Sequence, residues 1–131
     1  MTQRAEGRGR LLRWTLLAYS TLILILSLYP NPRELLPPGW SLTDTALHFT
    51  GYMPLGMLIA LALPSAKCDS PARLRLTAVA AVTVGALYGA AIEVGQAFVG
   101  RSADLRDAAV NVAAVGIGVL AVTAGRVIRR S

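Results

Sequence analysis

Residues 77–99 read TAVAAVTVGALYGAAIEVGQAFV, a long apolar run that contains a single charged side chain, Glu93. A helix of roughly 20 mostly apolar residues is long enough to cross a lipid bilayer. An ionisable side chain inside the bilayer is costly, and it usually faces neighbouring helices rather than lipid. This stretch therefore predicts a membrane-spanning helix that turns Glu93 toward the interior of a helical bundle.

Three further apolar stretches accompany this one, and we place the four spans at 11–28, 44–63, 77–99 and 108–125. Hydrophobic residues make up 54% of the 131 residues and charged residues only 15%, whereas a soluble domain is about 25% charged. Little of the chain lies outside the spans. We therefore expect a single all-α domain over residues 1–131, a polytopic membrane protein built as a bundle of four transmembrane helices.

The basic residues predict how the spans are oriented. They are concentrated in the N-terminal arm, the loop between the second and third spans, and the C-terminal tail: Arg4, Arg8, Arg10, Arg13, Lys67, Arg73, Arg75, Arg126, Arg129 and Arg130. The other two loops hold only Arg33, Arg101 and Arg106. The positive-inside rule places the richer segments, and both termini, in the cytoplasm. Because the net charge of +6 is divided among short segments, we do not expect nucleic acid as a partner.

Polar residues gather at the outer ends of the last three spans. His48 lies four residues into the second span, Glu93 lies six residues before the end of the third, and Asn111 lies three residues into the fourth. At about 1.5 Å per residue, the three side chains lie within about one turn of the same depth. Shared depth from distant parts of the sequence predicts one outward-facing polar site.

Neighbouring residues extend this site, although some have a simpler explanation. Asp44 shares a helix face with His48 but could also be the N-cap of its helix. Asp104 and Asp107 could act only on the helix dipole, and they share one helical face with Asn111. The candidate polar cluster comprises His48, Asp44, Glu93, Gln96, Arg101, Asp104, Asp107 and Asn111.

Small residues and one proline predict how the helices pack. Gly85 and Gly89 precede Glu93 at intervals of four, and such spacing lets another helix approach closely. Ala114 and Gly118 continue the face of Asn111 in the same way. Pro54 removes a backbone donor and leaves the carbonyl of Thr50 without its helical partner, which predicts a bend or a polar contact there.

These motifs resemble the VanZ-like family of bacterial membrane proteins. The resemblance rests on residues 44–118, through Asp44-x-x-x-His48-Phe49-x-x-Tyr52, Gly89-x-x-x-Glu93-x-x-Gln96 and Gly100-Arg101-Ser102-x-Asp104-x-x-Asp107-x-x-x-Asn111. The chain departs from the family pattern at Thr45, where a basic residue is common, and at Ala114, where glycine is. The resemblance implies a multi-pass protein of the bacterial cytoplasmic membrane, and it links the family's namesake to glycopeptide (teicoplanin) resistance.

The function that we expect is binding of an amphipathic envelope ligand at the outer leaflet, in a pocket walled by spans two to four. Arg101 would meet an anionic headgroup, because its guanidinium is a planar, fixed set of donors. Membrane lipids or lipid-linked wall precursors are the expected partners, and we expect no cofactor and no bound metal.

Two alternatives stay open. In an enzyme, His48 would be a general base oriented by Asp44 or Glu93, or Asp44, His48, Glu93 and Asp107 would hold a divalent metal. The sequence has no Ser/His/Asp triad motif, which favours a non-enzymatic role. In a structural accessory subunit of an envelope complex, the polar residues would only hold helices together.

Overall fold

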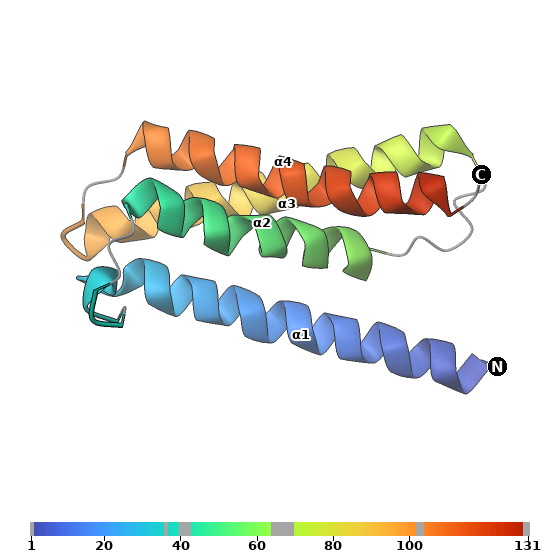
Figure 1. The fold of residues 1–131 in the computed structure, drawn as a ribbon, viewed down its shortest axis with the longest axis horizontal. Coiled ribbons are helices and arrows are strands. Elements are labelled where there is room, and N and C mark those ends of the chain that lie inside the picture. The colour runs from blue at the N-terminus through green and yellow to red at the C-terminus, as the bar shows by residue number, and fades with distance from the viewer. Residues whose placement is uncertain (1, 36, 40–42, 64–69, 102–103, 130–131) are drawn as a thin grey trace.

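The computed structural model describes residues 2–35, 37–39, 43–63, 70–101 and 104–129. This part of the chain contains helices and no strands: α1 (Thr2–Leu28), the short 3-10 helix η1 (Pro32–Leu35), α2 (Asp44–Ala62), α3 (Pro71–Phe98) and α4 (Leu105–Ile128) (Figure 1). The four α-helices are each long and apolar enough to cross a membrane. The prediction of an all-α, four-span protein is confirmed. Lys67, Ser102 and Arg130, and the side chains of Arg4 and Arg33, lie outside what is described.

Helix α2 has nearly the predicted bounds, whereas the other three helices extend beyond the predicted apolar spans. Helix α3 begins at Pro71, six residues earlier than predicted. Ser70 caps it by accepting a hydrogen bond from the backbone N–H of Arg73 at 3.3 Å. Proline suits the first helical turn, and arginine is a good helix former. The helix therefore continues through a polar turn that a search for apolar residues leaves out.

An aspartate caps α4, whereas a threonine caps α2. Thr43 caps α2 by accepting a hydrogen bond from the N–H of Ala46 at 3.2 Å, so the interpretation of Asp44 as the N-cap is wrong. A threonine directly before the helix can supply the cap, which places Asp44 in the first turn. Asp104 is the cap of α4 and accepts from the N–H of Arg106 at 2.8 Å.

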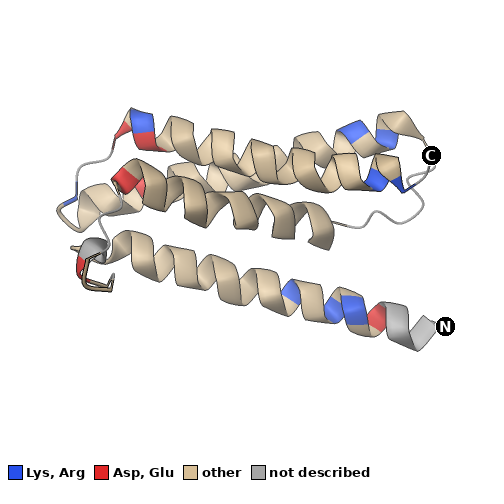
Figure 2. Cartoon of the chain, in the orientation of Figure 1, with Lys and Arg blue, Asp and Glu red and all other residues tan. Residues whose placement is uncertain are grey.

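Helices α2, α3 and α4 form a compact core, and α1 lies along one side of it against α2 and α3 (Figure 1). Helix α1 begins and α4 ends at the same end of the bundle, which we call the basic end because arginines gather there (Figure 2). We call the opposite end, where α2 and α4 begin and α3 ends, the polar end. The start of α1 and the end of α4 thus lie at one end of the bundle; that this end faces the cytoplasm stays a prediction.

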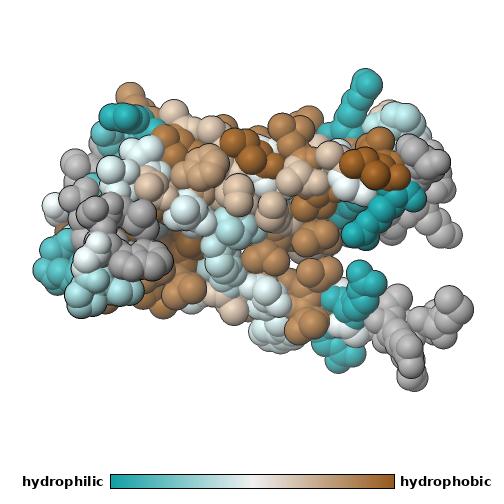
Figure 3. All heavy atoms as spheres, in the orientation of Figure 1, coloured by the Kyte–Doolittle hydropathy of each residue, from teal (hydrophilic) through white to brown (hydrophobic). Residues whose placement is uncertain are grey.

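On the face shown in Figure 3, most of the strongly hydrophobic residues lie between the two ends, with some weakly polar residues among them. Large hydrophobic side chains such as Leu17, Leu87 and Leu120 are more than half exposed. A water-soluble protein rarely shows so extensive an apolar surface, whereas lipid chains solvate it. The distribution of side chains therefore agrees with four spans in a bilayer.

Glycine brings α2 and α4 into backbone contact. A Cβ atom at Gly56 would lie 2.8 Å from the Cα of Val115, and one at Gly118 would lie 2.9 Å from the backbone nitrogen of Met57. On α3, a Cβ at Gly85 would lie 2.6 Å from a methyl group of Val115. In lipid, where the hydrophobic effect does not drive helices together, such close packing is a main source of association. The prediction from Gly85 and Gly118 is confirmed, and Gly56 adds a contact that it missed.

Helix α2 is continuous through Pro54. The sequence predicted a bend or a polar contact at the carbonyl of Thr50. The structure has a polar contact one residue further along, where the hydroxyl of Tyr19 on α1 donates to the carbonyl of Gly51 at 3.0 Å. This bond joins α1 to α2 about one turn before Pro54.

Candidate functional site

Three buried side chains from three helices form a hydrogen-bonded chain near the polar end. Nδ1 of His48 lies 2.9 Å from Oδ1 of Asn111, and Nδ2 of Asn111 donates to Oε1 of Glu93 at 3.4 Å. Because a carboxylate oxygen accepts, the amide nitrogen of Asn111 faces Glu93 and its oxygen faces His48. Nδ1 of His48 therefore carries the proton in this bond. The shared depth that the sequence predicted for these residues is found.

A glycine makes room for this chain of bonds. A Cβ atom at Gly89 would lie 3.3 Å from the Cβ of Asn111 and 3.3 Å from a ring carbon of Tyr52. Gly89 therefore lets α3 approach α2 and α4 one turn below Glu93. Asn111 is only 1% exposed and Glu93 6%, so their polar atoms depend on each other instead of water.

Asp104 and Asp107, at the start of α4, interact with the hydrogen-bonded side chains in different ways. Oδ2 of Asp107 lies 3.6 Å from Nε2 of His48, within ion-pair distance. Asp104 instead uses its backbone N–H, which donates to Oε2 of Glu93 at 3.3 Å, while its carboxylate caps α4. Asp104 precedes the helix, so the prediction that it shares a helical face with Asp107 and Asn111 is wrong. Its side chain is explained by capping alone.

Gln96 and Arg101 bind the end of α1. Nε2 of Gln96 donates to the carbonyl of Ser27 at 3.0 Å, and Nη1 of Arg101 donates to the same carbonyl at 2.7 Å and to that of Tyr29 at 3.3 Å. The last carbonyls of a helix lack intrahelical partners, and they attract a cation. Arg101 therefore reaches α1, and among the described residues no ion pair joins it to Asp104 or Asp107.

The turn after α3 sets the position of Arg101. Gly100 has a φ angle of 78°, a left-handed conformation that suits glycine. The N–H groups of Val99 and Arg101 both donate to the carbonyl of Gln96, at 3.1 and 3.0 Å. This turn reverses the chain and brings the guanidinium back over the end of α1.

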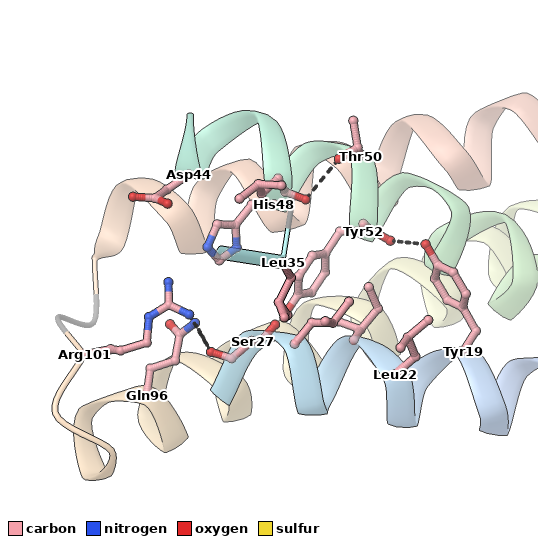
Figure 4. Close-up of a pocket in the computed structure, with 14 residues that line it drawn as sticks. Tyr19, Leu22, Ser27, Leu35, Asp44, His48, Thr50, Tyr52, Gln96 and Arg101 are labelled. Carbon is pink, nitrogen blue, oxygen red and sulfur yellow. Dashed lines mark hydrogen bonds between the residues drawn. The ribbon is translucent and has the colours of Figure 1, made fainter. Parts of the chain in front are cut away.

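A pocket of about 360 Å³ opens between α1 and α2 at the polar end (Figure 4). Its polar lining includes Asp44, His48, Gln96 and Arg101, and its apolar lining comes mainly from α1: Leu22, Ile23, Leu26 and, from η1, Leu35. The expectation of a pocket walled by spans two to four is therefore wrong, because α1 supplies one wall. Glu93, Asp107 and Asn111 do not line this pocket; they hold His48 from behind.

Two tyrosines belong to this region although the predicted cluster omitted them. Tyr52 is 1% exposed, and its ring is stacked on His48 with 6.0 Å between the ring centres. Its hydroxyl makes no hydrogen bond of good geometry within the described residues, and the Ser27 side chain is the polar group near it. Tyr19 lines the pocket from α1. The spacing of Asp44, His48 and Tyr52 already pointed to Tyr52, whereas nothing in the first span pointed to Tyr19.

The described residues contain no group of three or more His, Cys, Asp or Glu side chains that could hold a metal ion. Asn111 lies between His48 and Glu93, and both oxygens of Glu93 accept hydrogen bonds from protein groups. The four-residue ligand set considered from the sequence is therefore not assembled.

In a comparison with protein families, residues 14–126 match the family described as VanZ/LLP1. The match begins within α1 and so extends beyond the region 44–118 that carried the resemblance. The chain matches none of the curated proteins. Among solved structures it also has no match. Because the family model covers most of the sequence, and the four apolar helices agree with a multi-pass membrane protein, the chain belongs to the VanZ-like family.

Proposed function

We propose that this protein binds an amphipathic, anionic ligand of the cell envelope in the pocket between α1 and α2. The observation that carries the proposal is the pocket's change of polarity with depth. Asp44, Gln96 and Arg101 lie at the polar end, whereas Leu22 lies farther from that end, near Tyr19 (Figure 4). A lipid-linked precursor or phospholipid has the same order, with a charged headgroup at the membrane surface and a hydrocarbon chain below it.

Arg101 is suited to the headgroup of such a ligand. The two bonds to α1 use one guanidinium nitrogen, Nη1, and a guanidinium has five N–H donors. The remaining donors can bind phosphate oxygens in the planar, two-point manner that arginine favours. Gln96 is held beside it by the same carbonyl of Ser27. Asp44 also lines this end of the pocket.

The surroundings of His48 support binding more than catalysis. Its Nδ1 hydrogen is directed to Asn111 and its Nε2 faces Asp107. A general base needs a ring nitrogen within reach of a substrate proton; here Nδ1 is bonded to Asn111, and Nε2 lies 3.6 Å from the carboxylate of Asp107. His48 therefore forms part of the pocket wall, fixed by the buried chain of bonds behind it.

A binding measurement with a matched control tests this function. The protein is reconstituted in nanodiscs of phosphatidylethanolamine, and a polyprenyl phosphate is titrated into the wild type, Arg101→Gln and Arg106→Gln. Arg106 is an exposed arginine at the same end that does not line the pocket. We expect about tenfold or greater loss of affinity for Arg101→Gln, since a charge-assisted hydrogen bond contributes about 1.5–3 kcal/mol. Arg106→Gln should bind like the wild type.

Equal affinities for wild type and Arg101→Gln, with the helical content unchanged, would contradict the proposal. A second variant, Leu26→Trp, fills the pocket and keeps Arg101. It should weaken binding as well, because the ligand's chain is excluded. Unchanged binding by Leu26→Trp would place the ligand elsewhere on the protein.

A further inference from the structure

A second cavity lies at the basic end, where no part of the proposed ligand pocket reaches. This groove has a volume of about 850 Å³ and lies between the first turns of α1 and the last turns of α2 and α4. The hollow beside the basic turns of α1 is visible in the space-filling view (Figure 3). It shares no residue with the pocket at the polar end.

Four arginines line the groove, namely Arg8, Arg13, Arg126 and Arg129, and its lining contains no acidic side chain. The rest of the lining is small or apolar and includes Leu12, Leu61 and Val122. Arginines on α1 thus face arginines on α4 across an apolar floor. Like charges gathered around one cavity repel each other, and a bound anion would relieve that repulsion.

Hydrogen bonds inside the protein hold two of these arginines. Nη2 of Arg126 donates to the carbonyl of Ala60 at 2.8 Å, and Nε of Arg13 donates to the carbonyl of Gly9 at 3.2 Å. The carboxyl end of a helix carries partial negative charge, which disfavours an anion beside α2 and α4. Arg126 offsets this charge at α2 through its bond to Ala60, and the other guanidinium donors stay available to a ligand.

The apolar floor decides which anion fits. A free phosphate or a soluble anion would leave the floor without contacts, whereas the acyl chains of a lipid would cover it. Basic cavities between transmembrane helices are suited to anionic headgroups. We propose that the groove binds an anionic phospholipid of the leaflet at the basic end, with its phosphate among the four arginines and its chains against Leu12, Leu61 and Val122.

The simplest alternative is that the arginines serve only the orientation of the protein in the membrane. Arg73 and Arg75 allow a charge-matched test, because they lie at the same end, on the first turns of α3, but outside the groove. The variant Arg8→Gln/Arg129→Gln removes two charges from the groove, and Arg73→Gln/Arg75→Gln removes two from outside it. Neither Arg8 nor Arg129 has a side-chain bond to the described residues, so stability should change little.

The measurement is native mass spectrometry of the full-length protein with phosphatidylglycerol as the probe and phosphatidylethanolamine as the neutral comparison. We expect bound phosphatidylglycerol to fall at least fivefold in Arg8→Gln/Arg129→Gln, and less than twofold in Arg73→Gln/Arg75→Gln. An equal fall in both variants would overturn the proposal in favour of general surface charge. An unchanged amount in the groove variant would overturn it as well.

Two further variants separate this site from its alternatives. Leu61→Trp fills the groove and keeps all four arginines, and Leu61 is exposed enough for the fold to accept a larger side chain. This variant should also lower binding of phosphatidylglycerol. Unchanged binding would contradict the proposal that the acyl chains lie in the groove. In an Arg101→Gln background, Arg8→Gln/Arg129→Gln should still lower bound phosphatidylglycerol at least fivefold, so that failure at one cavity is distinguishable from failure at the other.

Discussion

Helix α1 and the core of α2, α3 and α4 are held by different kinds of contact. In the membrane-spanning windows of the core helices 28–33% of residues are buried, against 6% in α1. The core joins backbone to backbone through Gly56 and Gly118, and side chain to side chain through Asn111. Helix α1 is joined mainly by single side chains that donate to backbone carbonyls, such as Tyr19 to Gly51 and Tyr88 to Ser20.

This difference explains where the cavities lie. The pocket at the polar end and the groove at the basic end are both lined by α1 on one side and by core helices on the other. Close packing between glycine faces leaves little space within the core, whereas the sparse contacts of α1 leave room for ligands. The core is thus a fixed platform, and α1 is the wall that forms both cavities.

The largest expected effect comes from the glycine contacts of the core. Gly118→Ala places a methyl group against the backbone of α2, within 2.9 Å of the nitrogen of Met57, so the two helices must move apart. We expect a loss of about 3 kcal/mol or more in unfolding free energy, at the upper end of overpacking effects. The measurement is reversible unfolding in detergent.

Gly116→Ala is the matched control, because a Cβ at Gly116 meets nothing within 4 Å. It should change the unfolding free energy by less than about 0.5 kcal/mol. If both substitutions cost the same, backbone contact between α2 and α4 does not hold the core together.

A smaller effect is expected in the polar chain of the core. Asn111→Leu removes the hydrogen-bond partner of Nδ1 of His48 and of Oε1 of Glu93, two buried polar atoms. We expect a loss of about 2 kcal/mol, within the range for a buried group that loses its hydrogen bond. Glu93→Gln keeps an oxygen acceptor for Asn111 and should cost less. If Glu93→Gln lowered the unfolding free energy more than Asn111→Leu in the same assay, Asn111 would not be the central residue of this hydrogen-bonded chain.

The smallest effect on stability is expected where α1 is attached. The double variant Gln96→Leu/Arg101→Gln removes the bonds to the carbonyls of Ser27 and Tyr29. Interhelical hydrogen bonds in lipid contribute about 0.6–2 kcal/mol, so we expect about 1 kcal/mol. Hydrogen exchange should accelerate in the last turns of α1 and stay unchanged in α4. Equal acceleration in both helices would contradict the distinction between wall and platform.

The sequence predicted the core better than the wall, and the reason is physical. Core positions carry periodic constraints: small residues at intervals of four and costly polar groups at one depth identify Gly85, Gly89, Glu93 and Asn111 without a structure. Helix α1 is little buried, and its residues 14–28 are mostly apolar without a periodic pattern that marks one face. Its bonds go to backbone carbonyls, which every residue has, and no pattern of side chains marks them.

The same difference explains the errors at the polar end. The residue at which each helix begins decides which side chain is its cap. Thr43 rather than Asp44 therefore caps α2, and Asp104 caps α4 instead of lying within it. The bonds of Arg101 to carbonyls at the end of α1 were not predicted either, and the turn at Gly100 directs the guanidinium there. Such a turn follows from the φ angle of one glycine, which spacing alone does not specify.

The most direct test of the account asks whether a ligand lies between α1 and α2. A photoreactive amino acid is placed at Leu26, which lines the pocket, or at Ile25, which is largely exposed and does not. Cross-linking to a polyprenyl phosphate is then compared with and without Arg101→Gln. We predict strong cross-linking at position 26 that Arg101→Gln reduces severalfold, and weak cross-linking at position 25 that it does not change. Equal yields at the two positions, or yields independent of Arg101, would contradict the account.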